Sequence, residues 1–447
     1  MAETQEEKFR RMTEAPIGSL IVKLAIPCII SMLVTAFYNM ADTFFVGQLK
    51  SNAATGAVGI VFSMMAIIQA VGFFFGHGSG NYISRELGKK NYEEAEKMAA
   101  TGFISAFAAG IAIMLLGEIF LEELAYFLGS TETILPYTLD YLRAILFGAP
   151  WITASFVLNN QLRFQGSAVY AMVGITCGAV LNIVLDPVLI FVFDMGIAGA
   201  GYATVISQFV SFCVLLYGMQ KRGGIKLRFK NFSTEWKYYG NIFSGGFPSL
   251  ARQGLASIAT ITLNHAAGPF GDAAIAAMGV VQRIVIFGAS AMVGFGQGFQ
   301  PFCGFNFGAG LYKRVKEGFY FSVKTSAIFL MAISVAGFVF APELIALFRN
   351  DPEVIEIGSR ALRFQCITFT VHSWIVMSNM TTQVIGKALQ ATLIAISRQG
   401  LFFIPAVLIL SYCFGLTGIQ IAQPVADFCT FLIALPIQIK ILKEFDK

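Results

Sequence analysis

Residues 17–46 of the chain read IGSLIVKLAIPCIISMLVTAFYNMADTFFV, and one lysine and one aspartate are their only charged side chains. About 20 apolar residues in a helix are enough to cross the hydrocarbon core of a bilayer. An isolated strand leaves its backbone groups without partners in lipid, so a helix is the expected state. The stretch continues without a small-residue cleavage pattern, which favours a first transmembrane span over a removable signal peptide.

The whole chain has the composition of a multi-pass membrane protein. Of its 447 residues, 56% are hydrophobic and 13% are charged, whereas about 25% of a typical soluble domain is charged. This composition excludes an ordinary soluble enzyme, a disordered protein and a nucleic-acid binder. We expect an all-α integral membrane fold with twelve transmembrane helices. The further apolar runs cover residues 54–82, 95–120, 136–161, 168–192, 197–219, 240–265, 272–303, 316–340, 356–382, 389–412 and 416–440.

Basic side chains gather in every second loop. The loops between them are acidic or neutral, and Lys50 and Arg349 are the exceptions. The positive-inside rule then puts both termini and the long central loop in the cytoplasm, with the protein in the cell inner (plasma) membrane. The basic residues are Lys8, Arg10, Arg11, Arg85, Lys89, Lys90, Lys97, Lys221, Arg222, Lys226, Arg228, Lys230, Lys237, Lys313, Arg314, Lys316, Lys440, Lys443 and Lys447.

The two halves of the chain repeat each other at an offset near 220 residues, as the pairs Gly78 and Gly298, and Gly88 and Gly308, illustrate. Each half holds six spans, so both halves have the same orientation in the membrane. We expect an N-terminal lobe at 1–220, a cytoplasmic linker at 221–237 and a C-terminal lobe at 238–447. Two such pseudo-symmetric six-helix lobes suit alternating access, in which the lobes rock around a central site. The alternative is a duplication kept only for packing.

The first span carries a stripe of polar residues on one helix face, at spacing i, i+3, i+4 and i+7. An ionised side chain at mid-membrane costs about 2.5–3.5 kcal/mol on insertion scales, so an acid there is a functional candidate by default. The stripe consists of Thr35, Tyr38, Asn39 and Asp42.

A second acid lies in the fifth span, where Asn182 and Asp186 share one face and Pro187 follows directly. Proline frees a backbone carbonyl one turn earlier, and a free carbonyl beside a carboxylate and a carboxamide is a plausible cation site. We expect Asp42 and Asp186 to face one cavity and to bind Na⁺ or take up a proton. The alternative is that each acid pairs locally and fixes packing. The sixth span adds a polar stripe of Thr204, Ser207, Gln208 and Ser211.

The second half has no acids at the positions that match Asp42 and Asp186. It carries Arg252 and Gln253 instead, and Asp427 is its clear mid-span acid. We therefore expect the coupling chemistry in the first lobe. The polar residues of the second lobe serve gating, lobe contacts or substrate hydrogen bonds, or only packing.

Enzyme and cofactor motifs are missing from the sequence. The three histidines are far apart, and the run Gly76-x-Gly78-x-Gly80 follows no βα unit, so neither a metal site nor a dinucleotide site is expected. We predict that the protein is not an enzyme and uses no cofactor other than the coupling ion.

Three segments of the chain resemble the multidrug and toxic compound extrusion (MATE) family. They are residues 38–47 (YNMADTFFVG), residues 84–88 (SRELG) and residues 181–187 (LNIVLDP). Gly246-Phe247-Pro248-Ser249 with Arg252-Gln253 resembles the start of span 7 in the DinF/MepA-like branch of the family.

The resemblance implies twelve helices in two lobes around a V-shaped cavity, and export of cationic, amphipathic drugs driven by Na⁺ or H⁺. It implies antibiotic resistance as a consequence. In the branch that this chain resembles, the cation site matches Asp42, Asn182, Asp186 and Thr204, and cavity residues match Tyr38, Tyr141 and Asn159. We expect a monomer with small-molecule drugs and the lipid bilayer as its partners.

Two other transporter classes compete with this interpretation. A lipid-linked precursor flippase of the same superfamily often has extra helices or a strongly basic central cavity, and the sequence shows neither. A major facilitator symporter has an Asp-Arg pair between glycines in its 2–3 loop, whereas this loop reads Arg85-Glu86-Leu87-Gly88-Lys89-Lys90.

Overall fold

The computed structural model describes residues 4–49, 51–221 and 224–446, without the side chains of Asn39, Thr43, Asn52 and Thr55. The described residues form helices and contain no strand. The first half comprises α1 (Gln5–Glu14), α2 (Ile17–Gly47), α3 (Asn52–Gly88), α4 (Tyr92–Ile119), α5 (Leu121–Phe127), α6 (Leu135–Phe164), α7 (Ala168–Pro187) with the π-helical turn η1 (Val188–Val192), and α8 (Gly196–Lys221).

The second half begins after the short 3₁₀ helix η2 (Phe229–Asn231), which lies in the segment between α8 and α9. Its helices are α9 (Trp236–Ala267), the 3₁₀ turn η3 (Gly268–Phe270), α10 (Asp272–Gly308), α11 (Tyr312–Val339), α12 (Ala341–Phe348), α13 (Pro352–Phe369), α14 (His372–Val384), α15 (Ala388–Ile396), the π-helical segment η4 (Ser397–Phe403) and α16 (Ile404–Glu444).

The helices follow the twelve predicted spans in order. Nine helical segments of the described chain are long and apolar enough to cross a membrane. One of them, Ala388–Glu444, contains two predicted spans, because Gly415 has non-helical backbone angles (φ 58°, ψ −136°) and separates them. The two remaining predicted spans are α9 and the pair α13–α14. The predicted span 356–382 is therefore wrong as one continuous helix, since it is interrupted between Phe369 and His372.

The repeat is visible in the local structure of both halves. The Asn159 amide donates to the carbonyl of Ala171 at 3.0 Å, and the Asn379 amide donates to the carbonyl of Ala391 at 2.7 Å. Each pair ties one helix, α6 or α14, to the helix that follows it. The short helices α5 and α12 also occupy matching places. The duplication is thus retained in structure as well as in sequence.

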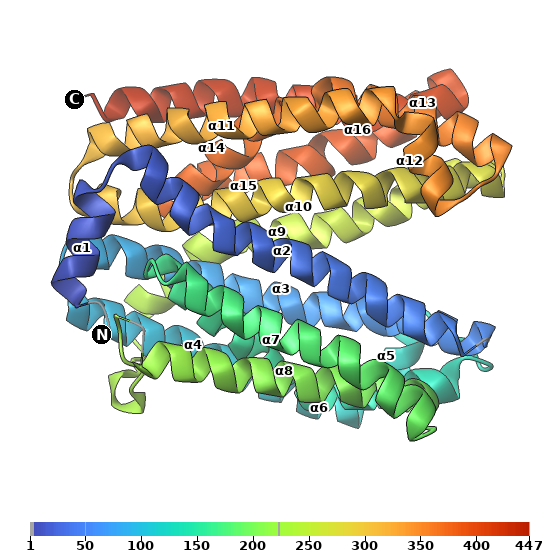
Figure 1. Ribbon diagram of the computed structural model, residues 1–447, viewed down its shortest axis with the longest axis horizontal. Helices are drawn as coiled ribbons and strands as arrows, with labels where there is room; N and C mark the ends of the chain where they lie inside the picture. The colour runs from blue at the N-terminus through green and yellow to red at the C-terminus, as the bar shows by residue number, and fades with distance from the viewer. Residues whose placement is uncertain (1–3, 50, 222–223, 447) are drawn as a thin grey trace.

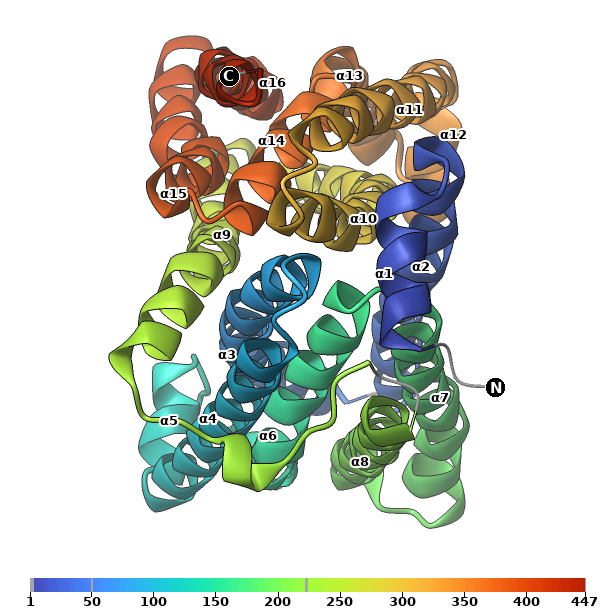
Figure 2. The ribbon, with the colours of Figure 1, turned by 90° about the vertical axis from the view of Figure 1, so that its left-hand side faces the viewer.

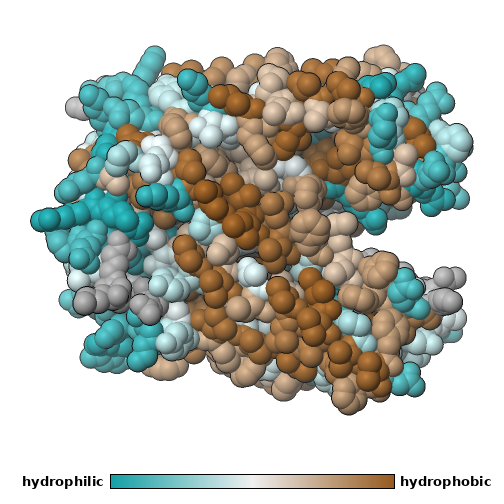
Figure 3. All heavy atoms as spheres, viewed as in Figure 1, coloured by the Kyte–Doolittle hydropathy of each residue, from teal (hydrophilic) through white to brown (hydrophobic). Residues whose placement is uncertain are grey.

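The helices form two bundles that meet at one end and separate at the other. Helices α2–α8 form one bundle and α9–α16 the other, and α2 and α9 each also pack against a helix of the opposite bundle (Figures 1 and 2). Both termini lie at the end where the bundles meet, which Figure 2 shows face on. A notch opens between the bundles at the opposite end (Figure 3), and we call it the interlobe cleft. Brown apolar side chains cover the middle of the face that Figure 3 shows, as expected for a lipid-facing surface.

Glycines let the backbones of the two bundles touch at the closed end. A Cβ added at Gly294 of α10 would lie 2.6 Å from the Cα of Ile29 in α2, and one at Gly298 would lie 2.5 Å from the Ala25 nitrogen. The repeat partner of Gly298 is Gly78 of α3, which packs in the same way against α9. Because any larger residue would overlap with backbone, these positions require glycine. We call this contact the glycine seam; it consists of Gly78, Gly88, Gly246, Gly294, Gly298 and Gly308.

We expect Gly298→Ala to loosen the closed end. Alanine favours a helix over glycine by about 1 kcal/mol, but the overlap with Ala25 costs about 1–3 kcal/mol, so the overlap decides the result. Cys303 lies on the same helix and is fully buried, so its labelling by N-ethylmaleimide, followed by peptide mass spectrometry, should become faster. Gly279→Ala on the same helix is the matched control, because its Cβ would meet no atom within 4 Å. Equal labelling in both variants would contradict the seam.

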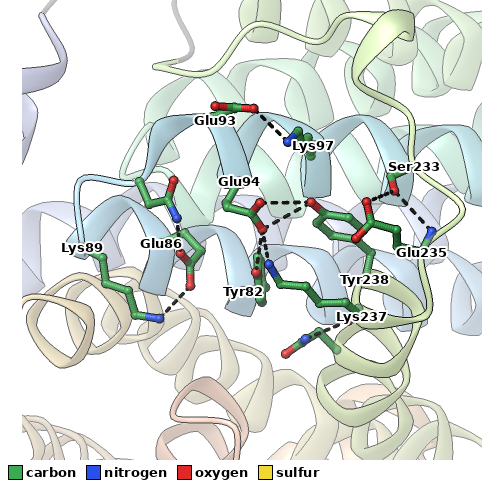
Figure 4. A network of polar contacts seen from close by, with 12 residues as sticks. Tyr82, Glu86, Lys89, Glu93, Glu94, Lys97, Ser233, Glu235, Lys237 and Tyr238 are labelled. Atoms are coloured by element: carbon green, nitrogen blue, oxygen red, sulfur yellow. Dashed lines mark hydrogen bonds and ion pairs between the residues drawn. The ribbon is translucent and has the colours of Figure 1, made fainter.

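An ionic network also joins the two bundles at the closed end. The Glu94 carboxylate of α4 accepts hydrogen bonds from Lys237 (2.6 Å) and from the Tyr238 hydroxyl (3.2 Å), both on α9. Tyr82 of α3 donates to the same carboxylate at 3.1 Å. Figure 4 shows these side chains converging on Glu94 from two helices, α3 and α9. We call this group the Glu94 latch.

Breaking the latch should have a smaller effect than disturbing the seam. Lys237 is 51% exposed, and an ion pair this open to water contributes about 0–1 kcal/mol. We expect Glu94→Gln to raise the labelling rate of Cys303 by about fivefold at most. Glu93→Gln is the control, because Glu93 pairs with Lys97 of its own helix at 2.8 Å and joins no lobes. An increase as large in the control as in Glu94→Gln would exclude the latch.

The first helix lies across the closed end and is bonded to both bundles (Figure 2). Lys8 of α1 donates to the Ser167 hydroxyl of the first bundle at 2.8 Å. On the other side, Asn306 of α10 donates to the Met12 carbonyl at 3.0 Å, and Arg314 of α11 donates to the carbonyl of Ala15 at 2.8 Å. Helix α1 thus bridges the two bundles.

Candidate functional site

The polar residues predicted in spans 1, 5 and 6 meet inside the first bundle. Asp186 of α7 and Thr204 of α8 are fully buried, and Asn182 is 1% exposed. In the orientation that satisfies both of its polar atoms, the Asn182 amide donates to the Asp186 carboxylate at 3.0 Å and accepts from the Thr204 backbone N–H at 3.2 Å. The amide thus holds the carboxylate in one place.

Asp42 approaches the same site from α2. Its carboxyl group is 9% exposed and is close enough to Asp186 for the two groups to interact electrostatically. One Asp42 oxygen is buried and has no hydrogen-bond partner among the described residues. Of the described basic side chains, none forms an ion pair with either acid. Two carboxyl groups in an apolar bundle without a counter-charge favour uptake of a cation or a proton, because burial and like charge both disfavour the ionised pair.

Two tyrosines complete the site. Tyr38 lies one helical turn before Asp42 on α2, and Tyr141 comes from α6; both are buried. Both phenol rings are within electrostatic range of the two acids and of Thr204. The site therefore draws on four helices of the first bundle, and hydroxyl, amide and carboxylate oxygens are the ligands that hard cations prefer.

Helix α7 changes its geometry directly after Asp186. Pro187 ends the regular α-helix, and the five residues Val188–Val192 continue it as a π-helical turn. Proline has no N–H to donate and crowds the carbonyl one turn earlier, and π-helical turns of this kind are frequent at functional sites. The disruption that the sequence predicts at this point is present in the structure.

A pocket lies beside the carboxylate site and shares Tyr38 with it. Its volume is about 90 Å³. Aromatic and aliphatic side chains form most of its wall. The wall consists of Thr35, Tyr38, Phe62, Met65, Ala66, Ile68, Gln69, Ile152, Phe156, Ile175, Gly178, Ala179, Gln208 and Ser211.

Three predicted site residues are not part of this arrangement. Asn159 is bonded to the backbone of α7, as described above, and does not line the pocket. Arg252 and Gln253 lie on α9 in the second half of the chain. The cation-site residues and both tyrosines are brought together, whereas these three are not. The prediction for Asn39 falls on a side chain outside the described part of the structure.

Sequence reasoning missed the pocket residues that α3 and α6 supply. Gln69 and Met65 come from α3, and Phe156 comes from α6. A single signal was available, because Gln69 is an isolated polar residue in the apolar run 64–75. Phe156 had none, since one phenylalanine among 44 does not stand out.

Fold and site together define a multi-pass membrane protein with two bundles, a cleft between them and a buried carboxylate pair in the first. The chain matches the MatE family over residues 27–188 and 248–409, and it belongs to that family. The two matched segments begin 221 residues apart, which confirms the internal repeat.

Curated relatives span nearly the whole chain. The multidrug export protein MepA of Staphylococcus aureus (strain MSSA476) is 26% identical over 432 residues, which is 96% of this chain and 95% of the relative. The protein of the same name from Staphylococcus saprophyticus is also 26% identical over 432 residues.

Solved structures share the fold. An outward-facing multidrug resistance MATE family transporter of the MOP superfamily is 25% identical and has a TM-score of 0.91, with 97% of this chain and 98% of that chain covered. A MATE crystal structure in the straight conformation is 24% identical, with a TM-score of 0.93 and coverage of 98% and 99%. The prediction of an all-α membrane protein with twelve helices in two lobes is confirmed.

We expect Asn182→Ala to destabilise the protein. Loss of the amide leaves the fully buried Asp186 carboxylate without its donor, which costs about 1–3 kcal/mol. The measurement is the melting temperature of the purified protein in detergent, which should fall. Thr260→Ala is the control, since the Thr260 hydroxyl bonds only to the Ala256 carbonyl of its own helix and is exposed. A variant that melts at the wild-type temperature would contradict the assigned role of Asn182.

Proposed function

We propose that this protein is a cation-coupled multidrug efflux antiporter that exports cationic, amphipathic drugs by alternating access. The observation that carries the proposal is the buried Asp42–Asp186 pair, which lies beside an apolar pocket. Tyr38 is next to the two acids and also lines the pocket. A cation or proton that enters the pair and a drug that enters the pocket act on the same stretch of α2. Occupancy of one is thereby coupled to occupancy of the other.

The coupling follows from elementary electrostatics. Without a cation, the two carboxyl groups repel each other and attract a positively charged drug toward the adjoining pocket. A Na⁺ ion or a proton removes that negative charge, so the drug loses its electrostatic attraction and leaves through the open cleft. Movement of α2 against α7 transmits the change to the lobes, because α2 also packs against α10 in the glycine seam.

Similar proteins support the choice of substrate. The curated relatives are called multidrug export proteins, and one solved structure is described as a multidrug resistance transporter. The pocket wall agrees with such cargo, because aromatic and aliphatic surfaces accept varied apolar groups while Gln69 and Gln208 add hydrogen-bonding groups.

The proposal includes an orientation in the plasma membrane. Lys89, Lys90 and Lys237 are at the closed end with both termini. The positive-inside rule puts that end in the cytoplasm, so the cleft opens outward. We further propose that the protein works as a monomer without a cofactor and has no enzymatic activity.

The test is uptake into proteoliposomes. We expect accumulation of a fluorescent organic cation such as ethidium when either a Na⁺ gradient or a pH gradient is imposed, and the effective gradient identifies the coupling ion. Asp42→Asn and Asp186→Asn should each abolish that uptake, and drug resistance in cells, while the protein still reaches the membrane. Gly279→Ala, which changes no site residue, should transport normally. Full transport in both aspartate variants, or no dependence on either gradient, would refute the proposal.

A further inference from the structure

A groove runs between α11 and α13 on the outer side of the second bundle, near the open end of the molecule (Figures 1 and 2). Its volume is about 400 Å³. The α13 side of the groove is a stripe at spacing i, i+3, i+4 and i+7, formed by Arg360, Arg363, Phe364 and Ile367. Phe338 of α11 forms the opposite side. The groove thus combines two guanidinium groups with an apolar lining.

The internal repeat shows what this groove lacks. Helices α4 and α11 begin 220 residues apart, and the same offset relates Arg143 of α6 to Arg363 of α13. In the first half, Arg143 forms an ion pair with Glu118 of α4 at 3.5 Å. The position that corresponds to Glu118 in the second half is Phe338, which carries no charge. The first half therefore supplies a carboxylate for its arginine, and the second half does not.

The groove carries a net positive charge. Among the described residues, neither Arg360 nor Arg363 forms an ion pair. Arg363 donates its Nε–H to the Phe338 carbonyl at 3.2 Å and lies over the Phe338 ring, so its partner is a neutral group. Glu356 also lines the groove, one turn before Arg360. One carboxylate against two guanidinium groups leaves one positive charge uncompensated.

The groove lies at the depth of the lipid headgroups. Helix α11 has 28 residues and is about 42 Å long at 1.5 Å per residue, which matches a bilayer of about 40–45 Å including its headgroups. Phe338 is the residue before the end of this helix, so its contact with Arg363 is close to the membrane surface. Phe338 is 45% exposed and Ile367 is 68% exposed. This apolar surface is available to acyl chains.

The chemistry of the groove matches that of a charged lipid. A guanidinium fork binds the oxygens of a phosphate through parallel N–H bonds. We propose that the groove between α11 and α13 binds an anionic phospholipid from the leaflet at the open end, with its phosphate on Arg360 and Arg363 and an acyl chain on the apolar lining. A zwitterionic headgroup binds less well, because it brings its own positive charge. The lipid supplies the negative charge that a carboxylate supplies in the first half.

The experiment measures lipid binding inside the groove itself. Ile367→Trp places a fluorophore there, and lipids with brominated acyl chains quench it on contact in reconstituted vesicles. We expect brominated phosphatidylglycerol to bind about tenfold more tightly than brominated phosphatidylcholine, the value of one charge-assisted hydrogen bond. Adding Arg360→Gln and Arg363→Gln should abolish that preference. Arg143→Gln is the matched control and should leave it unchanged, because Arg143 is already paired in the first half.

A second variant supplies the acid that the groove lacks. Phe338→Glu gives Arg363 the carboxylate that Glu118 gives to Arg143, so the preference for phosphatidylglycerol should fall. Phe338→Gln is its control, since the side chain has the same size and no charge, and it should keep the preference. Equal quenching by the two lipids in the parent, or a preference that persists in the arginine variant, overturns the proposal.

Glycerol phosphate separates a lipid from a soluble anion, because it has the phosphate without the acyl chains. We expect a large excess of it to leave quenching by phosphatidylglycerol unchanged. Relief of that quenching by glycerol phosphate in the parent would identify a soluble anion as the occupant and would overturn the assignment to a lipid.

Discussion

The direct contact of backbones in the glycine seam is the constraint on which the rest of the structure depends. Gly298 of α10 against Ala25 of α2, and Gly78 of α3 against Ile242 of α9, bring helices of opposite bundles closer than side chains would permit. Because the bundles are held this tightly at one end, their divergence produces a cleft at the other. In the run Gly76-x-Gly78-x-Gly80, which resembles a nucleotide-binding turn, Gly78 has this packing as its physical reason, while Gly76 and Gly80 make room for the side chains of Asn160 and Phe164 on α6.

The two halves share a fold but not a charge. The first bundle buries Asp42 and Asp186, and no basic side chain of the described chain forms an ion pair with them. In the second half, the buried Asp427 is paired with Arg398. Duplication thus supplied two equivalent scaffolds, and the substitution of a few polar residues left an acid pair without an ion-pair partner in one and a neutralised acid in the other. The two halves can share a fold and still differ in their charged residues, because the contacts between the helices depend on small residues and not on the charged ones.

Much of the architecture could be predicted from the sequence, because a helix that crosses the lipid bilayer must be long and apolar, and both properties can be read from the sequence. The stripe from Tyr38 to Asp42 and the pair Asn182–Asp186 were also visible, since helical spacing alone places them on one face. The break between α13 and α14 was not, because both pieces read as one apolar run. The contributions of Gln69 and Phe156 to the pocket were hidden as well, since they depend on how α3 and α6 rotate against their neighbours. That rotation is set by packing, which periodicity does not encode.

Helix α1 is attached to the two bundles by bonds of different kinds. Toward the first bundle it uses side chains such as Lys8, whereas toward the second it offers the backbone carbonyls of Met12 and Ala15. Substitutions in α1 can remove the former but leave the latter in place. Evolution can therefore weaken the attachment of α1 to the first bundle while its attachment to the second stays unchanged. When the closed end opens, α1 then moves with the second bundle. The strength of its side-chain bonds to the first bundle sets the height of the energy barrier to that opening.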